Sequence, residues 1–217
     1  MMNSLFSSFD PTTKIYQLNW ISLISSTIIL PKMFWIKKSR TNKVLEIMEN
    51  KLIKEMKNIT KKKEMMIFSI SIFTTILIMN MMGLFPYIFT PTSHMCISMT
   101  IALPTWMMLM IYGWTKFTNK MFIHLLPTGT PTLIMPMMII IETTGNLIRP
   151  ISLSVRLTAN MIAGHLLMTL LGDMNESKII LMILPIQIML ILFESAISTI
   201  QAYVFCTLIT LYSSEIP

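Results

Sequence analysis

Long apolar segments alternate with short polar ones along the 217-residue chain. Residues 65–115 contain no Asp, Glu, Lys or Arg, and two further largely apolar segments cover 133–171 and 179–212. About 20 predominantly apolar residues suffice for a helix to cross the hydrocarbon core of a bilayer, so each segment can span it at least once. The pattern predicts an all-α membrane protein.

The first region, residues 1–64, predicts one span and one surface helix. Residues 15–36 are mostly apolar, and 17 residues between Lys14 and Lys32 are free of charge, which is the short end of the range for a spanning helix. The N-terminus lacks the basic region and cleavage site of a signal peptide, so we expect this span to be retained. Residues 37–64 are rich in Lys but carry a partial i, i+3, i+4 apolar stripe, which is typical of an amphipathic helix lying on a membrane surface.

The second region, residues 65–217, predicts the membrane core. Pro86 and Pro91 interrupt the first apolar segment, which therefore predicts a helical hairpin over 66–115 with spans at 66–85 and 95–115. Lys116 and Lys120 follow this hairpin. They should lie on the same side of the membrane as the basic segment that precedes it.

The last two apolar segments, within 132–212, are too long for upright spans. At about 1.5 Å per residue, continuous helices would reach about 60 and 50 Å, against about 30 Å for the hydrocarbon core. We expect a hairpin of two long, strongly tilted helices, which gives about five membrane helices in all plus the surface helix. The alternative is a pair of short spans broken at Pro150.

Composition excludes a single soluble domain. Hydrophobic residues make up 53% of the chain and charged residues 12%, with a mean hydropathy of +0.67; soluble domains carry about 25% charged residues. The net charge is +7, but ten of the 17 Lys and Arg residues lie within 37–63. A basic segment between apolar spans indicates the positive side of a membrane protein, so a nucleic-acid partner is not expected. Cys96 and Cys206 have neither metal-site nor disulfide-framework spacing, and we expect no metal or cofactor.

Ionisable side chains interrupt the segment 133–171. At 100° per residue, Arg149 lies about 20° and Arg156 about 40° from Glu142 around a helix, and Asn160 returns to the angle of Glu142. His165 falls about 140° away. An ionisable group at membrane depth costs about 2.5–3.5 kcal/mol on insertion scales, so such groups usually pair or contact water.

The segment 179–212 carries a second polar stripe, formed by Glu194, Ser198 and Gln201 at i, i+4 and i+7. Two polar stripes on adjacent helices in lipid suggest an ion path. A carboxylate and an imidazole can each take and release a proton, whereas an arginine stays charged at physiological pH. These residue types are therefore suited to the transfer of protons rather than of other ions.

Structural roles remain open for the same residues. Arg149, next to Pro150, can extend its charge to the basic side of the membrane, and Glu142 can pair with it. His165 and Glu194 can each be held by a structural hydrogen bond. Arg156 lies furthest from any helix end and is the most difficult to explain in this way.

Four stretches resemble one known family. They are MNMMGLFPYIFTPTSH at 79–94, HLLPTGTPTLIMPMMIIIETTGNLIRP at 124–150, SVRLTANMIAGHLL at 154–167 and ESAISTIQAYVF at 194–205. Together they resemble the subunit a family of mitochondrial ATP synthases, in the same order over most of residues 79–212. Residues 1–64 match in pattern more than in sequence.

The resemblance implies a non-catalytic stator subunit of the membrane motor in the mitochondrial inner membrane, with the N-terminus in the intermembrane space. The implied partners are the ring of c subunits, other membrane-sector and peripheral-stalk subunits, and the lipid bilayer. No phosphate-binding GxxxxGK[ST] segment is present, in keeping with a subunit that does no ATP chemistry itself.

The resemblance also implies roles for individual residues. Arg156 would face the carboxylate of the ring and separate two aqueous half-channels, because a fixed cation favours the charged carboxylate locally. His165 and Glu194 would belong to the half-channel from the intermembrane space and Glu142 to the one that opens to the matrix. Asn160 and Gln201 would be their polar neighbours. From the resemblance we would expect a neutral residue in many relatives at the position of Arg149.

Two other classes of protein would leave different marks in the sequence. A self-contained channel or antiporter would typically show an internal repeat, and the sequence shows none. A purely structural subunit of a respiratory complex would have little reason to keep Arg156, His165 and Glu194 at membrane depth.

Overall fold

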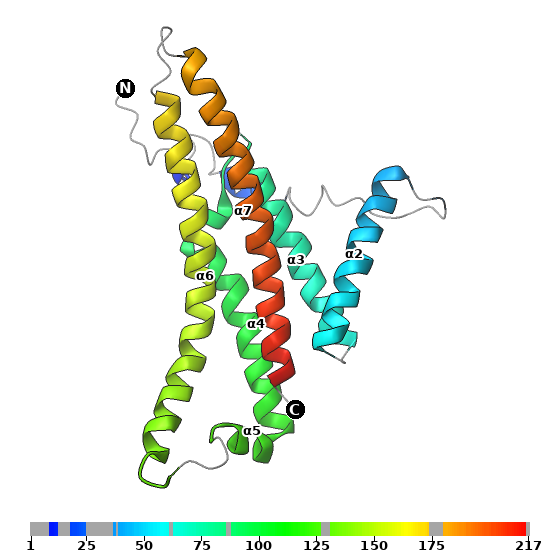
Figure 1. Cartoon of the computed structure of the whole chain (residues 1–217), viewed down its shortest axis with the longest axis vertical. Helices are drawn as coiled ribbons and strands as arrows, with labels where there is room; N and C mark the ends of the chain where they lie inside the picture. The colour runs from blue at the N-terminus through cyan, green and yellow to red at the C-terminus, as the bar shows by residue number, and fades with distance from the viewer. Residues whose placement is uncertain are drawn as a thin grey trace.

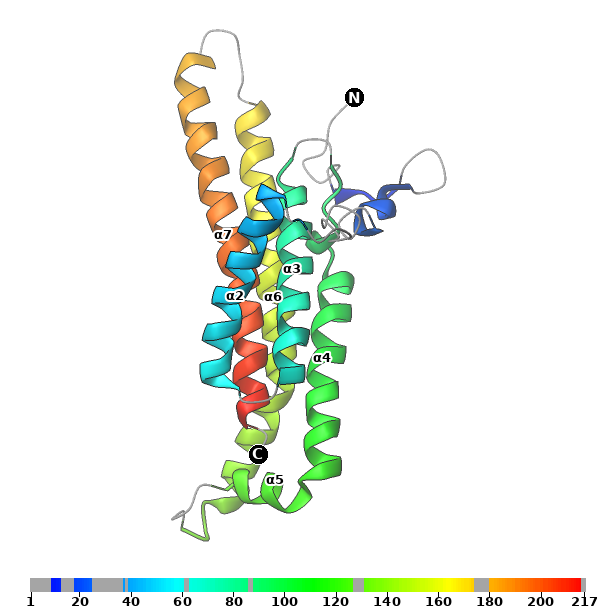
Figure 2. The same cartoon turned by 90° about the vertical axis from the view of Figure 1, so that its right-hand side faces the viewer.

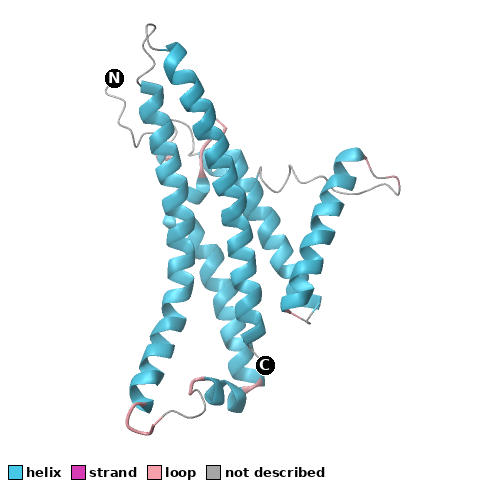
Figure 3. Ribbon diagram, viewed as in Figure 1, coloured by secondary structure: helices cyan, strands magenta, loops and turns pink. Residues whose placement is uncertain are grey.

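A computed structural model describes residues 9–12, 18–24, 37, 39–60, 63–85, 88–126, 131–173 and 180–215. All regular structure in these ranges is helical, which confirms the expected all-α class (Figure 3). The span expected over 15–36 lies mostly outside the described residues. Within it the structure shows the 3₁₀ turn η2 at Leu18–Trp20.

Among the described residues, four helices are long and apolar enough to cross a membrane. They are α3 at Lys63–Gly83, α4 at Met95–Lys116, α6 at Met135–Asp173 and α7 at Ile180–Glu215. The 3₁₀ turn η3 at Pro91–Ser93 precedes α4, and the short helix α5 at Thr118–His124 follows it. The expected spans at 66–85 and 95–115 correspond to α3 and α4.

The helices pack in an order that differs from their order along the chain. The principal contacts of α3 are with α7, those of α4 are with α6, and α6 also contacts α7 (Figure 1). The core between them is formed by Ile72, Ile76, Ala102, Leu109, Leu153, Leu157, Ala202, Phe205 and Ile209. The consecutive helices α3 and α4 run antiparallel (Figure 2). Each of them nevertheless packs mainly on one of the two long helices.

Hydroxyl groups within the spans bond to their own helices. Ser154 donates to the carbonyl of Ile151 and Ser198 to that of Ser195, each at 2.8 Å. Such bonds satisfy hydroxyls where no water is at hand. The same two hydroxyls also lie 3.0 and 3.1 Å from methionine sulfurs on α4 and α3, so small polar groups and flexible thioethers fill the helix contacts.

The long helices α6 and α7 are continuous. α6 has 39 residues and includes Pro150, and α7 has 36 residues and includes Pro185. The alternative of two short spans broken at Pro150 is therefore wrong. At about 1.5 Å per residue both helices exceed the hydrocarbon thickness by more than 20 Å, so in a bilayer they must tilt or project from it. They run side by side over their upper parts, and α6 curves away from α7 below (Figure 1).

The Lys-rich segment forms α2 at Arg40–Ile59, and the side chain of Ser39 accepts a hydrogen bond from the Asn42 N–H at its start. The second half of α2 packs on α3 and α7, where Met56 is fully buried beside Met66 and Cys206. The apolar residues of its first half, such as Ile47 and Met48, are exposed. The bundle thus covers half of the stripe that we expected to face a membrane surface, because only one end of α2 comes close to α3 (Figure 1).

The two ends of the bundle differ in character. α3 begins at Lys63 and α4 ends at Lys116 at the end where α7 also terminates (Figure 1). At the opposite end α6 terminates and α7 begins, and Trp20 packs against Phe89 and His94 with ring centroids 5.6 Å from each. Lys116 and the basic start of α3 therefore share one end, as expected of a positive side.

Candidate functional site

The contact between α6 and α7 brings together two of the predicted polar residues. Asn160 donates from Nδ2 to Oε1 of Gln201 over 3.0 Å, and Gln201 is buried. The two stripes recognised along the sequence therefore face one another at this level. A side-chain amide pair of this kind holds two helices together in an apolar medium.

Glu194 lies one to two turns further along the same contact. Its side chain is 8% exposed, and its Oε1 has no hydrogen-bond partner within the described structure. The carboxylate reaches the backbone of α6 because residue 164 is glycine: a Cβ at Gly164 would lie 2.8 Å from Oε1. Gly164 has no local signal in the sequence, because only the packing shows what it faces.

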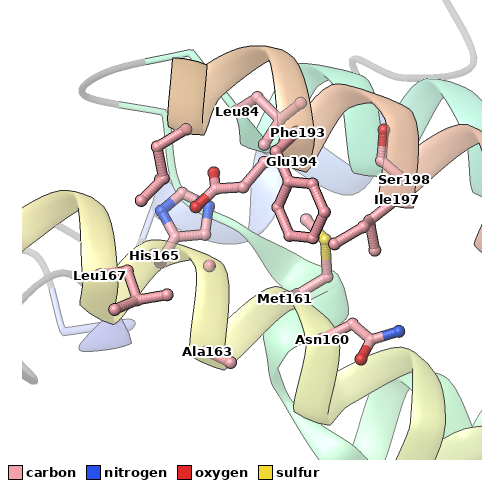
Figure 4. Close-up of a pocket in the computed structure, with 12 residues that line it drawn as sticks. Leu84, Asn160, Met161, Ala163, His165, Leu167, Phe193, Glu194, Ile197 and Ser198 are labelled. Carbon is pink, nitrogen blue, oxygen red and sulfur yellow. The ribbon is translucent and has the colours of Figure 1, made fainter. Parts of the chain in front are cut away.

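His165 faces Glu194 from α6 (Figure 4). Its Nε2 is buried and, as far as the chain is described, makes no hydrogen bond. Phe9 packs against the His165 ring in a T-shaped arrangement, with the ring centroids 6.0 Å apart. Two buried polar atoms without protein partners, on groups that carry protons, indicate a site that water or a proton occupies.

Two cavities meet at this pair. One, of about 250 Å³, extends from Leu84 along α6 and α7 to Asn160 (Figure 4). The other, of about 610 Å³, reaches Asp10, Asn19 and Gln187. Both are lined by Leu84, His165 and Glu194, and both are large enough for several waters. The residues around Asp10 were not predicted to belong to the site, because they come from a segment with no local signal of function.

A third cavity, of about 40 Å³, lies toward the opposite end of α6. Glu142, Arg149 and Glu215 supply its charged lining. Nη1 of Arg149 is 2.6 Å from Oε2 of Glu215, and its Cζ is 4.7 Å from the centroid of the Tyr212 ring. Arg149 therefore binds the end of α7, a partner that sequence reasoning missed because it lies 66 positions away.

Arg156 stands apart from these cavities. It lies on the exposed side of α6, whereas Leu153, Leu157 and Met161 form the buried side. No carboxylate of the described residues pairs with it. One turn separates Arg156 from Asn160 on nearly the same face, so an exposed cation lies beside the polar contact of the two long helices.

Comparisons with known proteins cover nearly the whole chain. The sequence profile described as ATP synthase A chain matches residues 18–214. Proteins named ATP synthase subunit a from Locusta migratoria, Aedes albopictus and Drosophila melanogaster are 49%, 48% and 47% identical to this chain. Each alignment covers 100% of this chain and 100% of the relative.

Proposed function

The chain belongs to the family of the ATP synthase A chain, subunit a of the membrane sector, and on that premise we propose how it conducts protons. In this proposal it is the stator subunit, in the mitochondrial inner membrane, that guides protons to and from a rotating ring of c subunits. Protons reach the ring through one half-channel and leave it through another. The subunit does no ATP chemistry itself.

The observation that carries the proposal is the junction of two cavities at His165 and Glu194. Both side chains present a buried, unpartnered polar atom there within the described structure. An imidazole and a carboxylate can pass a proton between waters, so the junction suits the half-channel from the intermembrane space. The smaller cavity continues from it to Asn160, which is bonded to Gln201 near the outer face of α6.

The cavity at Glu142 supports a separate half-channel that opens to the matrix. It lies toward the end of the bundle where Lys63 and Lys116 are found, which is the positive side. Its described lining residues differ from those of the two cavities at Glu194. Two discontinuous aqueous paths are what rotation requires, because a continuous path would let protons cross without turning the ring.

Arg156 suits the boundary between the two paths. A cation exposed on the middle of a spanning helix is costly in lipid, so it calls for an anionic partner outside the chain. A carboxylate on each c subunit would supply that charge. The fixed arginine would favour the charged form of the carboxylate and prevent a proton from passing directly between half-channels.

The outer surface of α7 supports a partner of this kind. Only 11% of an apolar 18-residue stretch of α7 is buried within the chain. Large apolar side chains such as Met189, Phe193 and Ile200 are exposed. In the proposal the ring covers part of this surface beside Arg156, and lipid covers the rest.

The test is Arg156→Ala in inner-membrane vesicles, with assembly of the complex checked on native gels. We expect ATP synthesis and ATP-driven proton pumping to be lost while the complex still assembles. Arg149→Gln is the matched control, because that arginine is paired within the chain, and its effect should be mild. Normal synthesis with Arg156→Ala would refute the gating role and favour a purely structural subunit.

A further inference from the structure

Three charged side chains share the small cavity near the matrix end: Glu142 and Arg149 from α6, and Glu215 from α7. Of these, Arg149 and Glu215 form the ion pair. The polar side chain of Asn146 also lines the cavity, one turn from Glu142 and from Arg149.

The guanidinium of Arg149 is held by α7 on two sides. Glu215 accepts its hydrogen bond at 2.6 Å, and the ring of Tyr212 lies 4.7 Å from its Cζ. A charge-assisted hydrogen bond and an aromatic face together fix the direction of a planar guanidinium. The arginine is therefore turned toward the end of α7.

Without Glu215 the arginine would have one other carboxylate within the cavity lining. Glu142 lies two turns away on nearly the same face of α6, about 10 Å along the axis, a distance that two long side chains can bridge. An opposite charge within about 4–6 Å strongly favours the charged form of a carboxylate. Glu142 paired with a cation would accept protons poorly and could not relay them.

Resting on the proposed function, we propose that Glu215 is a positioning residue of the matrix half-channel. It neutralises Arg149 and turns it toward α7, and so leaves the Glu142 carboxylate available for proton exchange. Glu215 lines the same cavity, but its role is exerted through Arg149 and not by carrying protons itself.

The test compares three variants in vesicles that contain the assembled complex: Glu215→Gln, Arg149→Gln, and the double variant. With Glu215→Gln the uncompensated arginine should trap Glu142, and proton pumping should fall about tenfold, the effect of a nearby opposite charge on a proton site. Arg149→Gln removes the cation and should be mild. The double variant should restore pumping to the level of Arg149→Gln.

The order of these effects separates charge compensation from a structural link. If the pair only held α7 in place, all three variants would be impaired alike, and that result would overturn the proposal. Glu55→Gln is the matched control, because it removes another carboxylate that contacts α7, 3.3 Å from the hydroxyl of Tyr203. It should leave pumping unchanged.

Assembly itself provides a second readout. If Glu215→Gln fails to assemble while the double variant assembles and pumps, the uncompensated charge is again the cause. If the double variant fails to assemble as well, the pair is structural and the proposal is wrong. These results do not bear on the proposed function, because its own test is Arg156→Ala in a chain that keeps Glu215.

Discussion

The contact between Gly164 and Glu194 allows a sharp test of the cavity junction. Gly164→Ala adds one methyl group to α6, and its carbon would lie 2.8 Å from Oε1 and 2.9 Å from Cδ of Glu194. Ordinary contact begins at 3.4 Å, so the carboxylate must withdraw from its present position. The new methyl group cannot move, because it is attached to the backbone of a continuous helix.

The cost in stability should be small. Glu194 borders a cavity of about 250 Å³, so its side chain can move aside, at a cost of about 0.5–1.5 kcal/mol if one χ angle departs by about 30° from its staggered value. Alanine also favours helix over glycine by about 1 kcal/mol, which offsets much of that cost. We therefore expect normal assembly with a displaced carboxylate.

The cost in function should be larger. A displacement of about 1 Å at a reacting group can lower a rate by up to about a hundredfold. We expect ATP-driven proton pumping to fall about tenfold, measured by dye quenching in vesicles with matched amounts of complex. Gly145→Ala is the control, because nothing described lies within 4 Å of a Cβ at that position of the same helix. Normal pumping with Gly164→Ala, or equal loss with Gly145→Ala, would refute the role of this contact.

Two further predictions concern the same helices. Glu194→Gln keeps the shape of the side chain but cannot take up a proton, so pumping should fall about a hundredfold while native gels show an intact complex; retained pumping would exclude Glu194 from the path. Leu157→Ala opens a cavity at a fully buried position between α6 and its neighbours, which should destabilise the subunit by about 2–5 kcal/mol. We expect a lower melting temperature of the subunit in detergent, with proton pumping retained at low temperature. An unchanged melting temperature would show that position 157 is exposed or that its neighbours fill the space.

Much of the architecture could be predicted from local sequence. The charge-free run of residues 65–115 predicted two spans because lipid leaves an apolar chain few alternatives to helix. The two long segments predicted overlong helices, and the spacing of Asn160 and Gln201 placed both on polar faces. These inferences depend only on composition and helical periodicity, which are properties of neighbouring residues.

The pairing of helices could not be predicted in this way. The consecutive helices α6 and α7 contact each other, but α3 packs mainly on α7 and α4 mainly on α6, and no local pattern predicts these partners. In lipid, apolar faces are nearly equivalent, so the choice of neighbour depends on small residues and side-chain fit over long separations. No window of sequence contains both sides of such a contact.

The details of the candidate site depend on the same long-range packing. Its residue types followed from the cost of placing ionisable groups in lipid, which is why Arg156, His165, Glu194 and Glu142 stood out in the sequence. Only the folded chain opposes Gly164 to Glu194, ties Arg149 to Glu215 and opens cavities on either side of His165. Burial energy selects which segments enter the membrane, whereas the fit between helices distant along the chain decides where their few polar groups meet.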